Sequence, residues 1–188
     1  MNKLRLPVFL LSAFFLIQSC KKDTVSASAY TNAPFQANIN GTTWAPDTIS
    51  TTIDYDLDTK SKTFYCSGIK DQKEVIFSVA LLNASDSPGF STGTFNVDSV
   101  TVFAQYKTLQ QNQSGQYVYL PHGSVSPGSG TIIIPAVDSV AKKITGTFSF
   151  YSRSVTYDNS GQVQSISVDN ITAGEFKNIP YTFNDVQQ

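Results

Sequence analysis

The chain has 188 residues, with 13 Lys and Arg against 14 Asp and Glu, a formal net charge of −1 and a sequence pI of about 5.7. This balance provides no basic stripe to neutralise phosphates, which argues against nucleic acid as a partner. Ser and Thr are abundant, while Glu occurs only at Glu74 and Glu175; this composition favours strands and turns. One histidine and two cysteines leave few groups for zinc or nucleophilic chemistry.

The N-terminal segment is typical of an export signal. Two basic residues among the first five precede an apolar run from Val8 to Ile17, which has the length of a signal-peptide core. A membrane-spanning helix needs about 20 apolar residues, so this run is too short to be one. Ser19 and Cys20 complete an aliphatic-x-small-Cys pattern that resembles the lipobox of bacterial lipoprotein precursors. The resemblance implies that residues 1–19 form a lipoprotein signal peptide and that Cys20 is acylated.

Removal of the signal leaves a chain with the length of a single domain. The loss of Lys3 and Arg5 lowers the basic residues to 11 against 14 acidic ones, a net of −3. Residues 20–33 are then the lipidated cysteine and a flexible polar tether, and two or more acyl chains would anchor it stably to a membrane. The start Ser-Cys-Lys-Lys-Asp resembles lipoproteins of the Bacteroidetes group. With Lys21 and not Asp after the cysteine, the resemblance favours the outer membrane, at its periplasmic face or at the cell surface.

The domain is expected over residues 34–183, followed by a short tail, 184–188. It begins with Phe35–Ile39, which alternates apolar and polar residues and meets Asn40-Gly41. Asn-Gly predicts a type I′ hairpin, because both turn residues need positive φ. Thr42–Ala45 is the returning strand, and we expect Trp44 to fill one end of the core.

Further short strands follow, separated by turn signals. Residues 49–57 have period two, which places Asp54, Asp56 and Asp58 on the face opposite Tyr55 and Leu57. The apolar run 74–82 is expected to be a central strand. The remaining expectations are a further pair of strands at 93–97 and 100–106, an edge strand at 117–120, an irregular loop at 122–130, and a buried strand at 131–134 limited by Pro135.

The last third alternates most clearly. Ile144, Gly146, Phe148 and Phe150 fall on one face of a strand, and 163–168 and 171–176 follow. Together with Phe35-Gln-Ala-Asn-Ile-Asn-Gly41 and Trp44, the runs Ile144-Thr-Gly-Thr-Phe-Ser-Phe150 and Ile171-Thr-Ala-Gly-Glu-Phe176 resemble a family of uncharacterised Bacteroidetes lipoproteins. The family implies no activity. About ten short strands without helical periodicity predict an all-β domain, an antiparallel β-sandwich or alternatively a closed or partly open β-barrel.

Few residues suggest chemistry. Asp54, Asp56 and Asp58 form a weak calcium candidate, but an EF-hand loop would need Gly at Thr59 and Glu at Tyr65. His122 has no second histidine for zinc and no nucleophile motif beside it, so we interpret it as a surface loop residue. No catalytic residue, metal or cofactor is therefore predicted. Cys66 is the only thiol left in the domain, and we expect it to be buried.

Four Asp-Ser/Thr-aliphatic triplets resemble the acceptor for O-glycosylation in Bacteroidetes; their candidate residues are Thr24, Thr48, Ser99 and Ser139. The sequence thus favours a lipid-anchored outer-envelope protein that acts as a non-catalytic binding or structural module. A glycan-binding accessory lipoprotein, using tyrosines and the loop from Tyr117 to Gly130, is the first alternative. A hydrolase built on aspartates is the second. The partner would be a glycan or a protein.

Overall fold

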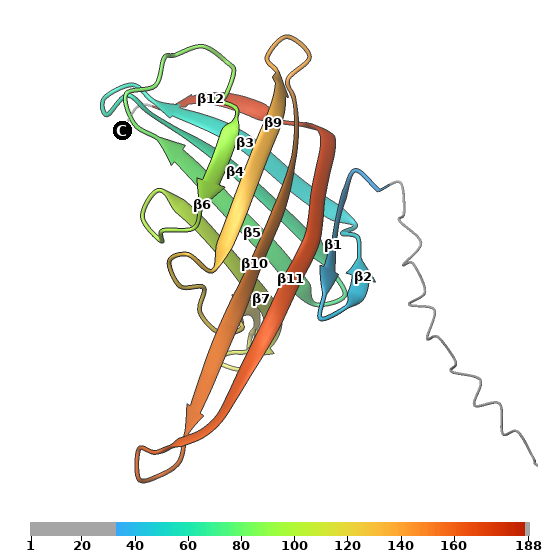
Figure 1. Ribbon diagram of the computed structural model, residues 1–188, viewed down its shortest axis with the longest axis vertical. Helices are drawn as coiled ribbons and strands as arrows, with labels where there is room; N and C mark the ends of the chain where they lie inside the picture. Colours follow the sequence, from blue (N-terminus) through green and yellow to red (C-terminus); the bar gives the residue numbers. More distant parts are fainter. Residues whose placement is uncertain (1–32, 187–188) are drawn as a thin grey trace, which may run out of the picture.

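The computed structural model describes residues 33–186, which form twelve β-strands. Two separate six-stranded sheets face one another (Figure 1), and they do not close into a barrel. The domain is therefore all-β with a sandwich architecture, which confirms the predicted fold class and replaces the barrel alternative. Within the described range, no helix is long and apolar enough to cross a membrane.

The first sheet has the order β2-β1-β11-β10-β9-β6, and all its neighbours are antiparallel. It contains the two longest strands. Its members are β1 (Phe35–Ile39), β2 (Thr42–Trp44), β6 (Gly93–Asn96), β9 (Gly130–Asp138), β10 (Lys143–Tyr157) and β11 (Val163–Pro180). The first strand therefore pairs with a strand near the end of the chain, with Phe35 opposite Phe176.

The second sheet has the order β12-β3-β4-β5-β7-β8. Its members are β3 (Thr48–Asp56), β4 (Ser61–Lys70), β5 (Lys73–Leu81), β7 (Val102–Gln111), β8 (Tyr117–Pro121) and β12 (Thr182–Val186). β5 is central and β8 lies at an edge, as expected. β12 pairs in parallel with β3, so the sheet includes Asn184–Val186, which the sequence assigned to a short tail.

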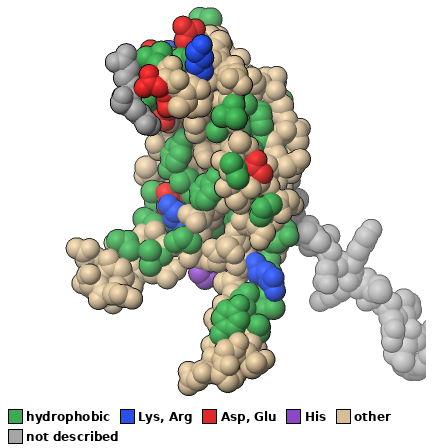
Figure 2. All heavy atoms as spheres, turned by 90° about the vertical axis from the view of Figure 1, so that its left-hand side faces the viewer, with side chains coloured by type: hydrophobic (Ala, Val, Ile, Leu, Met, Phe, Trp, Pro, Cys, Tyr) green, Lys and Arg blue, Asp and Glu red, His purple; other side chains and the backbone are tan. Residues whose placement is uncertain are grey.

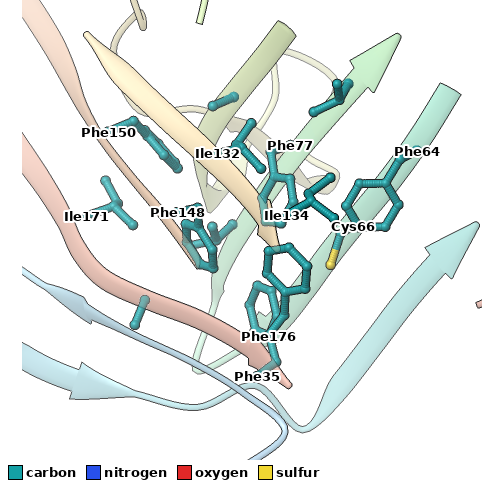
Figure 3. Close-up of a cluster of buried hydrophobic side chains, with 14 of the residues drawn as sticks. Phe35, Phe64, Cys66, Phe77, Ile132, Ile134, Phe148, Phe150, Ile171 and Phe176 are labelled. Atoms are coloured by element: carbon teal, nitrogen blue, oxygen red, sulfur yellow. The ribbon is translucent and has the colours of Figure 1, made fainter. Parts of the chain in front are cut away.

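Aromatic rings from both sheets fill the space between them. Phe35, Phe148 and Phe176 come from the first sheet, and Phe64 and Phe77 come from the second (Figure 3). The centroids of neighbouring rings lie 4.9–6.5 Å apart. All five rings are buried, so the alternation along each strand gives one apolar face to each sheet.

Cys66 lies within this core and is fully buried, which confirms the expectation for it. Burial raises the pKa of its thiol to about 12, and a hydrogen bond from Thr51 Oγ1, at 3.8 Å from Sγ, acts in the opposite direction. The thiol is therefore neutral and inaccessible, and it acts as a small apolar side chain.

The first hairpin has the predicted turn. Asn40 and Gly41 have φ values of 52° and 81°, as a type I′ turn requires. Trp44 is buried at one end of the core, and its indole Nε1 donates to the carbonyl of Lys70 at 3.3 Å. The turn thereby places β2, and with it Trp44, at the end of the core.

Two local expectations were wrong. The segments 93–97 and 100–106 do not pair with each other, because β6 pairs with β9 and β7 with β5 and β8 in the opposite sheet. Pro135 does not end its strand, since β9 continues to Asp138. Proline is tolerated there because β6 pairs only with 131–134 and the β9–β10 register shifts between Thr145 and Thr147.

Candidate functional site

Two hairpins extend from the same end of the sandwich (Figure 2), and the β10–β11 hairpin is also seen there in Figure 1. We call residues 151–170 of β10, β11 and their turn the long arm, and residues 107–121 of β7, β8 and their turn the short arm. The long arm extends beyond its neighbours, because β1 pairs with β11 only at 171–176 and β9 pairs with β10 only up to Phe150. Figure 2 shows the arms diverging, with the single histidine between them. We call this notch the fork.

His122 and Asp169 meet at the base of the fork. Nδ1 of His122 lies 2.7 Å from Oδ2 of Asp169, which belongs to the other sheet. The imidazole side chain is 42% exposed and the carboxylate 13%. Oδ1 of Asp169 accepts a hydrogen bond from Asn40 Nδ2 at 2.8 Å. The carboxylate is thus held by two donors and orients the imidazole.

The backbone around His122 is fixed on both sides. Its N–H donates to the carbonyl of Tyr106 at 2.9 Å, and its carbonyl accepts from Ser152 Oγ at 2.6 Å. Ser124 and Arg153 exchange two backbone hydrogen bonds of 2.9 Å. The loop after β8 is therefore joined directly to β10, across the two sheets.

Gly123 allows this close approach. Its φ is +85°, and a Cβ there would lie 2.7 Å from the carbonyl carbon of Arg153 and 2.8 Å from Ser152 Oγ. Both the positive φ and the contact with backbone favour glycine. The position of the imidazole therefore depends on glycine at position 123.

The electrostatics of the pair determine what His122 offers to a ligand. An ionised carboxylate only accepts hydrogen bonds, so Nδ1 carries the proton. Nε2 is then the free nitrogen, and no described residue bonds to it. Tyr106 packs edge-on against the imidazole at 5.8 Å, and its pKa is raised by burial and by the charge of Asp169. The site therefore presents one oriented, half-exposed nitrogen that accepts a hydrogen bond when neutral and donates one when protonated.

Hydroxyl groups continue this polar surface along the long arm. Ser152, Ser154 and Thr156 follow the buried Phe148 and Phe150 at period two, so they extend the inward face of β10. Ser154 and Ser167 lie 2.7 Å apart at their Oγ atoms, and Thr156 Oγ1 lies 2.6 Å from Ser165 Oγ. The inward face of the arm is thus a ladder of hydroxyls that leads to Asp169.

Lys62 lines a separate hollow of about 340 Å³ beside the loop 83–91. Its Nζ donates to the carbonyls of Ser87 at 2.6 Å and Gly89 at 2.9 Å, and it lies 5.7 and 5.6 Å from the ring centroids of Tyr55 and Phe183. Burial lowers its pKa, and the charge of Asp86 opposes this. Because the ammonium is already engaged, we interpret Lys62 as a clamp on the loop.

A second hollow, of about 330 Å³, lies on the first sheet. Glu175 is its only carboxylate, and Ile133 contributes an apolar side chain. Glu175 accepts from Gln36 Nε2 at 3.2 Å. This arrangement does not provide the two facing carboxylates that glycoside hydrolysis requires.

The calcium candidates do not converge. Asp54 accepts from Asn184 Nδ2 at 2.6 Å and from Thr52 Oγ1 at 3.1 Å. Asp56 caps the next turn, where the backbone N–H of Thr59 is the main cause of its lowered pKa. Over residues 33–186, no group of three or more His, Cys, Asp or Glu side chains is placed to hold a metal ion.

Two of the glycosylation candidates occupy similar turns. Asp98 Oδ1 accepts the N–H of Val100 at 2.8 Å, and Asp138 Oδ1 accepts that of Val140 at 3.0 Å. Ser99 and Ser139 are exposed between them, as is Thr48 at the start of β3. The hydrogen bond from Thr101 Oγ1 is the main cause of the lowered pKa of Asp98. Thr24 and the lipidation candidate Cys20 lie outside the described residues, as does the whole signal segment.

Sequence reasoning placed His122 in a loop but missed its partner. Asp169 is 47 positions away, and neither residue belongs to a motif. One signal was present: Ser152, Ser154, Ser165 and Ser167 put polar residues on the face of β10 and β11 that is apolar elsewhere. Polar residues at inward positions indicate where a strand extends beyond the hydrophobic core.

Comparison with known proteins gives a family but no activity. No curated protein and no solved structure matches the chain. The model of a domain of unknown function, DUF6252, matches residues 31–180 and so spans nearly the whole described domain. The chain therefore belongs to the DUF6252 family, whose function is unknown.

Proposed function

We propose that this chain is a lipid-anchored, non-catalytic binding module of the outer envelope, and that its ligand is held in the fork. One observation carries the proposal: an imidazole, 42% exposed, is oriented by a largely buried carboxylate between two projecting hairpins. A hydrogen bond that served only to join the sheets would not need an exposed ring with a free nitrogen. Functional groups held on a rigid scaffold between loops are typical of binding sites.

The neighbourhood of His122 supports binding over catalysis. Nucleophilic catalysis needs a hydroxyl or thiol within hydrogen-bond reach of the base. The Ser152 hydroxyl donates to the His122 backbone carbonyl and not to the imidazole, and Cys66 is in the core. The aspartate-based hydrolase is therefore a weaker proposal, because it needs two carboxylates in one hollow.

The proposed anchor is Cys20. Its acyl chains would attach the tether to the outer membrane, and residues 21–33 would set how far the domain extends from it. Metabolic labelling with a palmitate analogue in a bacterial host tests this. We expect label on the wild-type chain in the outer-membrane fraction, and an unlabelled chain when Cys20→Ser is introduced. A soluble, unlabelled wild-type chain would refute the anchor without bearing on the fork.

Glycan is the ligand class that we propose for the fork. The observation that favours it is the ladder of hydroxyls at Ser154–Ser167 and Thr156–Ser165, together with the imidazole and carboxylate at its base. Sugars offer rows of hydroxyls that both donate and accept, and neutral hydroxyls with an oriented imidazole complement them.

A glycan array screened with the full chain tests this function. We expect binding that is reduced at least tenfold by His122→Ala and by Ser154→Ala, while Val140→Ala, at a fully exposed site elsewhere, leaves it unchanged. Retained binding in His122→Ala would place the ligand outside the fork. A chain that binds no glycan at all would reject the ligand class.

Thr24, Thr48, Ser99 and Ser139 remain proposed O-glycosylation sites, supported at Ser99 and Ser139 by exposed turns. Bulky sugars require such accessible positions. Intact-mass measurement of the chain from its native host should show added hexose mass that is reduced in Ser99→Ala and Ser139→Ala. An unmodified wild-type mass would end this proposal.

A further inference from the structure

Asn40 makes contacts that its turn does not require. Its φ of 52° and the φ of 81° at Gly41 already satisfy the type I′ turn between β1 and β2. Its carboxamide also connects two groups of β11: Oδ1 accepts the backbone N–H of Asn170 at 2.8 Å, and Nδ2 donates to Oδ1 of Asp169 at 2.8 Å. The first turn of the domain therefore contacts the carboxylate that orients His122.

The two partners fix the orientation of this carboxamide. A backbone N–H only donates a hydrogen bond and an ionised carboxylate only accepts one, so the oxygen faces Asn170 and the nitrogen faces Asp169. The backbone N–H of Asn40 also donates to the carbonyl of Asn170 at 2.9 Å, one position beyond the last β1–β11 pair at Ile39. Asn40 is thus held through its backbone and through both ends of its side chain.

The turn alone would accept other residues at position 40. Asn, Asp and Gly are the residues that favour positive φ in a type I′ turn. Glycine would offer nothing to either group of β11. Aspartate could accept from the N–H of Asn170, but its second oxygen would face the carboxylate of Asp169, and like charges at such a distance are unfavourable. Of the three, only asparagine combines an acceptor and a donor, so the contacts with β11 select it more narrowly than the turn does.

We propose that Asn40 is a positioning residue of the fork, which acts through Asp169 on His122. Oδ1 of Asp169 accepts from Asn40, and Oδ2 lies 2.7 Å from Nδ1 of His122. With Oδ1 held, the carboxylate keeps Oδ2 against the imidazole, so the proton stays on Nδ1 and Nε2 stays available to a ligand. This inference deepens the proposed function and rests on it for the ligand, whereas the state of the imidazole can be measured without one.

The imidazole can be observed by itself, because His122 is the only histidine in the sequence. We would label the full chain with ¹⁵N-histidine, purify it in detergent without a histidine tag, and follow both ring nitrogens by NMR between about pH 5 and 8, where histidine changes its charge. Asn40→Gly and Asn40→Asp both introduce residues that suit the turn. A role in the turn alone therefore predicts the wild-type spectrum for both variants.

The positioning role predicts two different changes. Asn40→Gly frees Oδ1 of Asp169 without altering the charge of the site, so we expect a mixture of both neutral tautomers in place of Nδ1–H alone. Asn40→Asp adds a negative charge beside Asp169, which favours the imidazolium, so the midpoint of protonation should lie about one pH unit above that of the wild type. Glycan binding should be about fivefold weaker in both variants, as the loss of one hydrogen bond implies.

The other charges near the imidazole are common to all these proteins. Asp169 of β11 and Tyr106 of β7 are the titratable side chains that contact the ring, among residues 33–186. Lys107 and Arg153 follow the buried Tyr106 and Ser152 directly in their strands, so their side chains lie on the opposite faces. A difference in the midpoint therefore reports the charge at position 40.

Asn178 provides a matched control. It also has a positive φ, of 49°, and it lies near the other end of β11, where its Oδ1 accepts from Thr145 Oγ1 at 3.3 Å. Asn178→Gly and Asn178→Asp make the same changes in charge and backbone preference. We expect them to leave the resonances of His122 unchanged.

A wild-type tautomer and midpoint in both Asn40 variants would overturn the inference, and so would equal changes in the Asn178 variants. Circular dichroism should show a folded sheet for each variant; if one Asn40 variant unfolds, the other decides, and unfolding of both would assign position 40 to stability alone. Binding that is lost in His122→Ala but kept in both Asn40 variants refutes the positioning role and leaves the proposed function. A chain that binds no glycan rejects that function, and the NMR spectra still decide the role of Asn40.

Discussion

Substitution of the buried thiol should change how the stability of the domain depends on pH. Cys66 is fully buried between the sheets, and its pKa is raised from 9.0 to about 12. Below pH 9 the thiol is neutral in both the folded and the unfolded chain. Above pH 9 only the unfolded chain releases the proton, so the free energy of unfolding falls as the pH rises toward 12.

The slope follows from the size of the shift. Each pH unit between the two pKa values lowers the free energy of unfolding by about 1.4 kcal/mol. Between pH 8 and pH 10 the thiol should therefore destabilise the wild type by roughly 1.4 kcal/mol relative to Cys66→Ala, which has no such group. At pH 7 the wild type should be the more stable protein by about 1–2 kcal/mol, because the loss of a buried sulfur leaves a cavity. This advantage should shrink to near zero at pH 10.

Chemical denaturation at pH 7, 8, 9 and 10 measures both effects. The two proteins should lack residues 1–19 and carry Cys20→Ser, so that Cys66 is the only thiol. Tyr106 and Tyr181 also have raised pKa values, but they are common to both proteins and cancel in the difference. Parallel stability curves from pH 7 to 10 would contradict the reasoning, because they would mean that the native thiol ionises freely. Rapid modification of the native thiol by a maleimide would contradict it as well.

Three further substitutions test the site and its supports. Gly123→Ala should destabilise the domain by at least about 2 kcal/mol and expose the short arm to limited proteolysis, because a Cβ at φ +85° meets the Arg153 backbone; an unchanged melting temperature would show that the loop can move away. Lys62→Met keeps the apolar stem but leaves two carbonyls without a donor, so thermal denaturation should show a loss of about 2 kcal/mol; a gain in stability would refute the clamp. Asp169→Asn should cost about 1 kcal/mol and release the tautomer of His122 from Nδ1–H, which ¹⁵N NMR of the imidazole detects; an unchanged tautomer would show that the carboxylate does not orient the ring.

The sequence carried the local geometry of the strands and turns. Alternation assigned Ile144, Phe148 and Phe150 to the inward face of β10, and they are buried. Asn40-Gly41 specified its turn type because few residues adopt positive φ at low cost. Such features depend on neighbours a few positions apart, so a single sequence is enough to read them.

Only the tertiary structure decided which strands pair across long distances in the sequence and which side chains those pairings bring together. β1 joins β11, β12 joins β3 in parallel, and β6 and β7 separate into different sheets. The same arrangement brings His122 to Asp169 and leaves the long arm unsupported. The physical reason is that the free energy gained by hydrophobic burial depends on the apolar area that is covered. It does not depend on which strand covers that area, so it does not specify the partner. The alternation within a strand fixes which side faces inward, whereas the choice of neighbour follows from how strands of both sheets share one core.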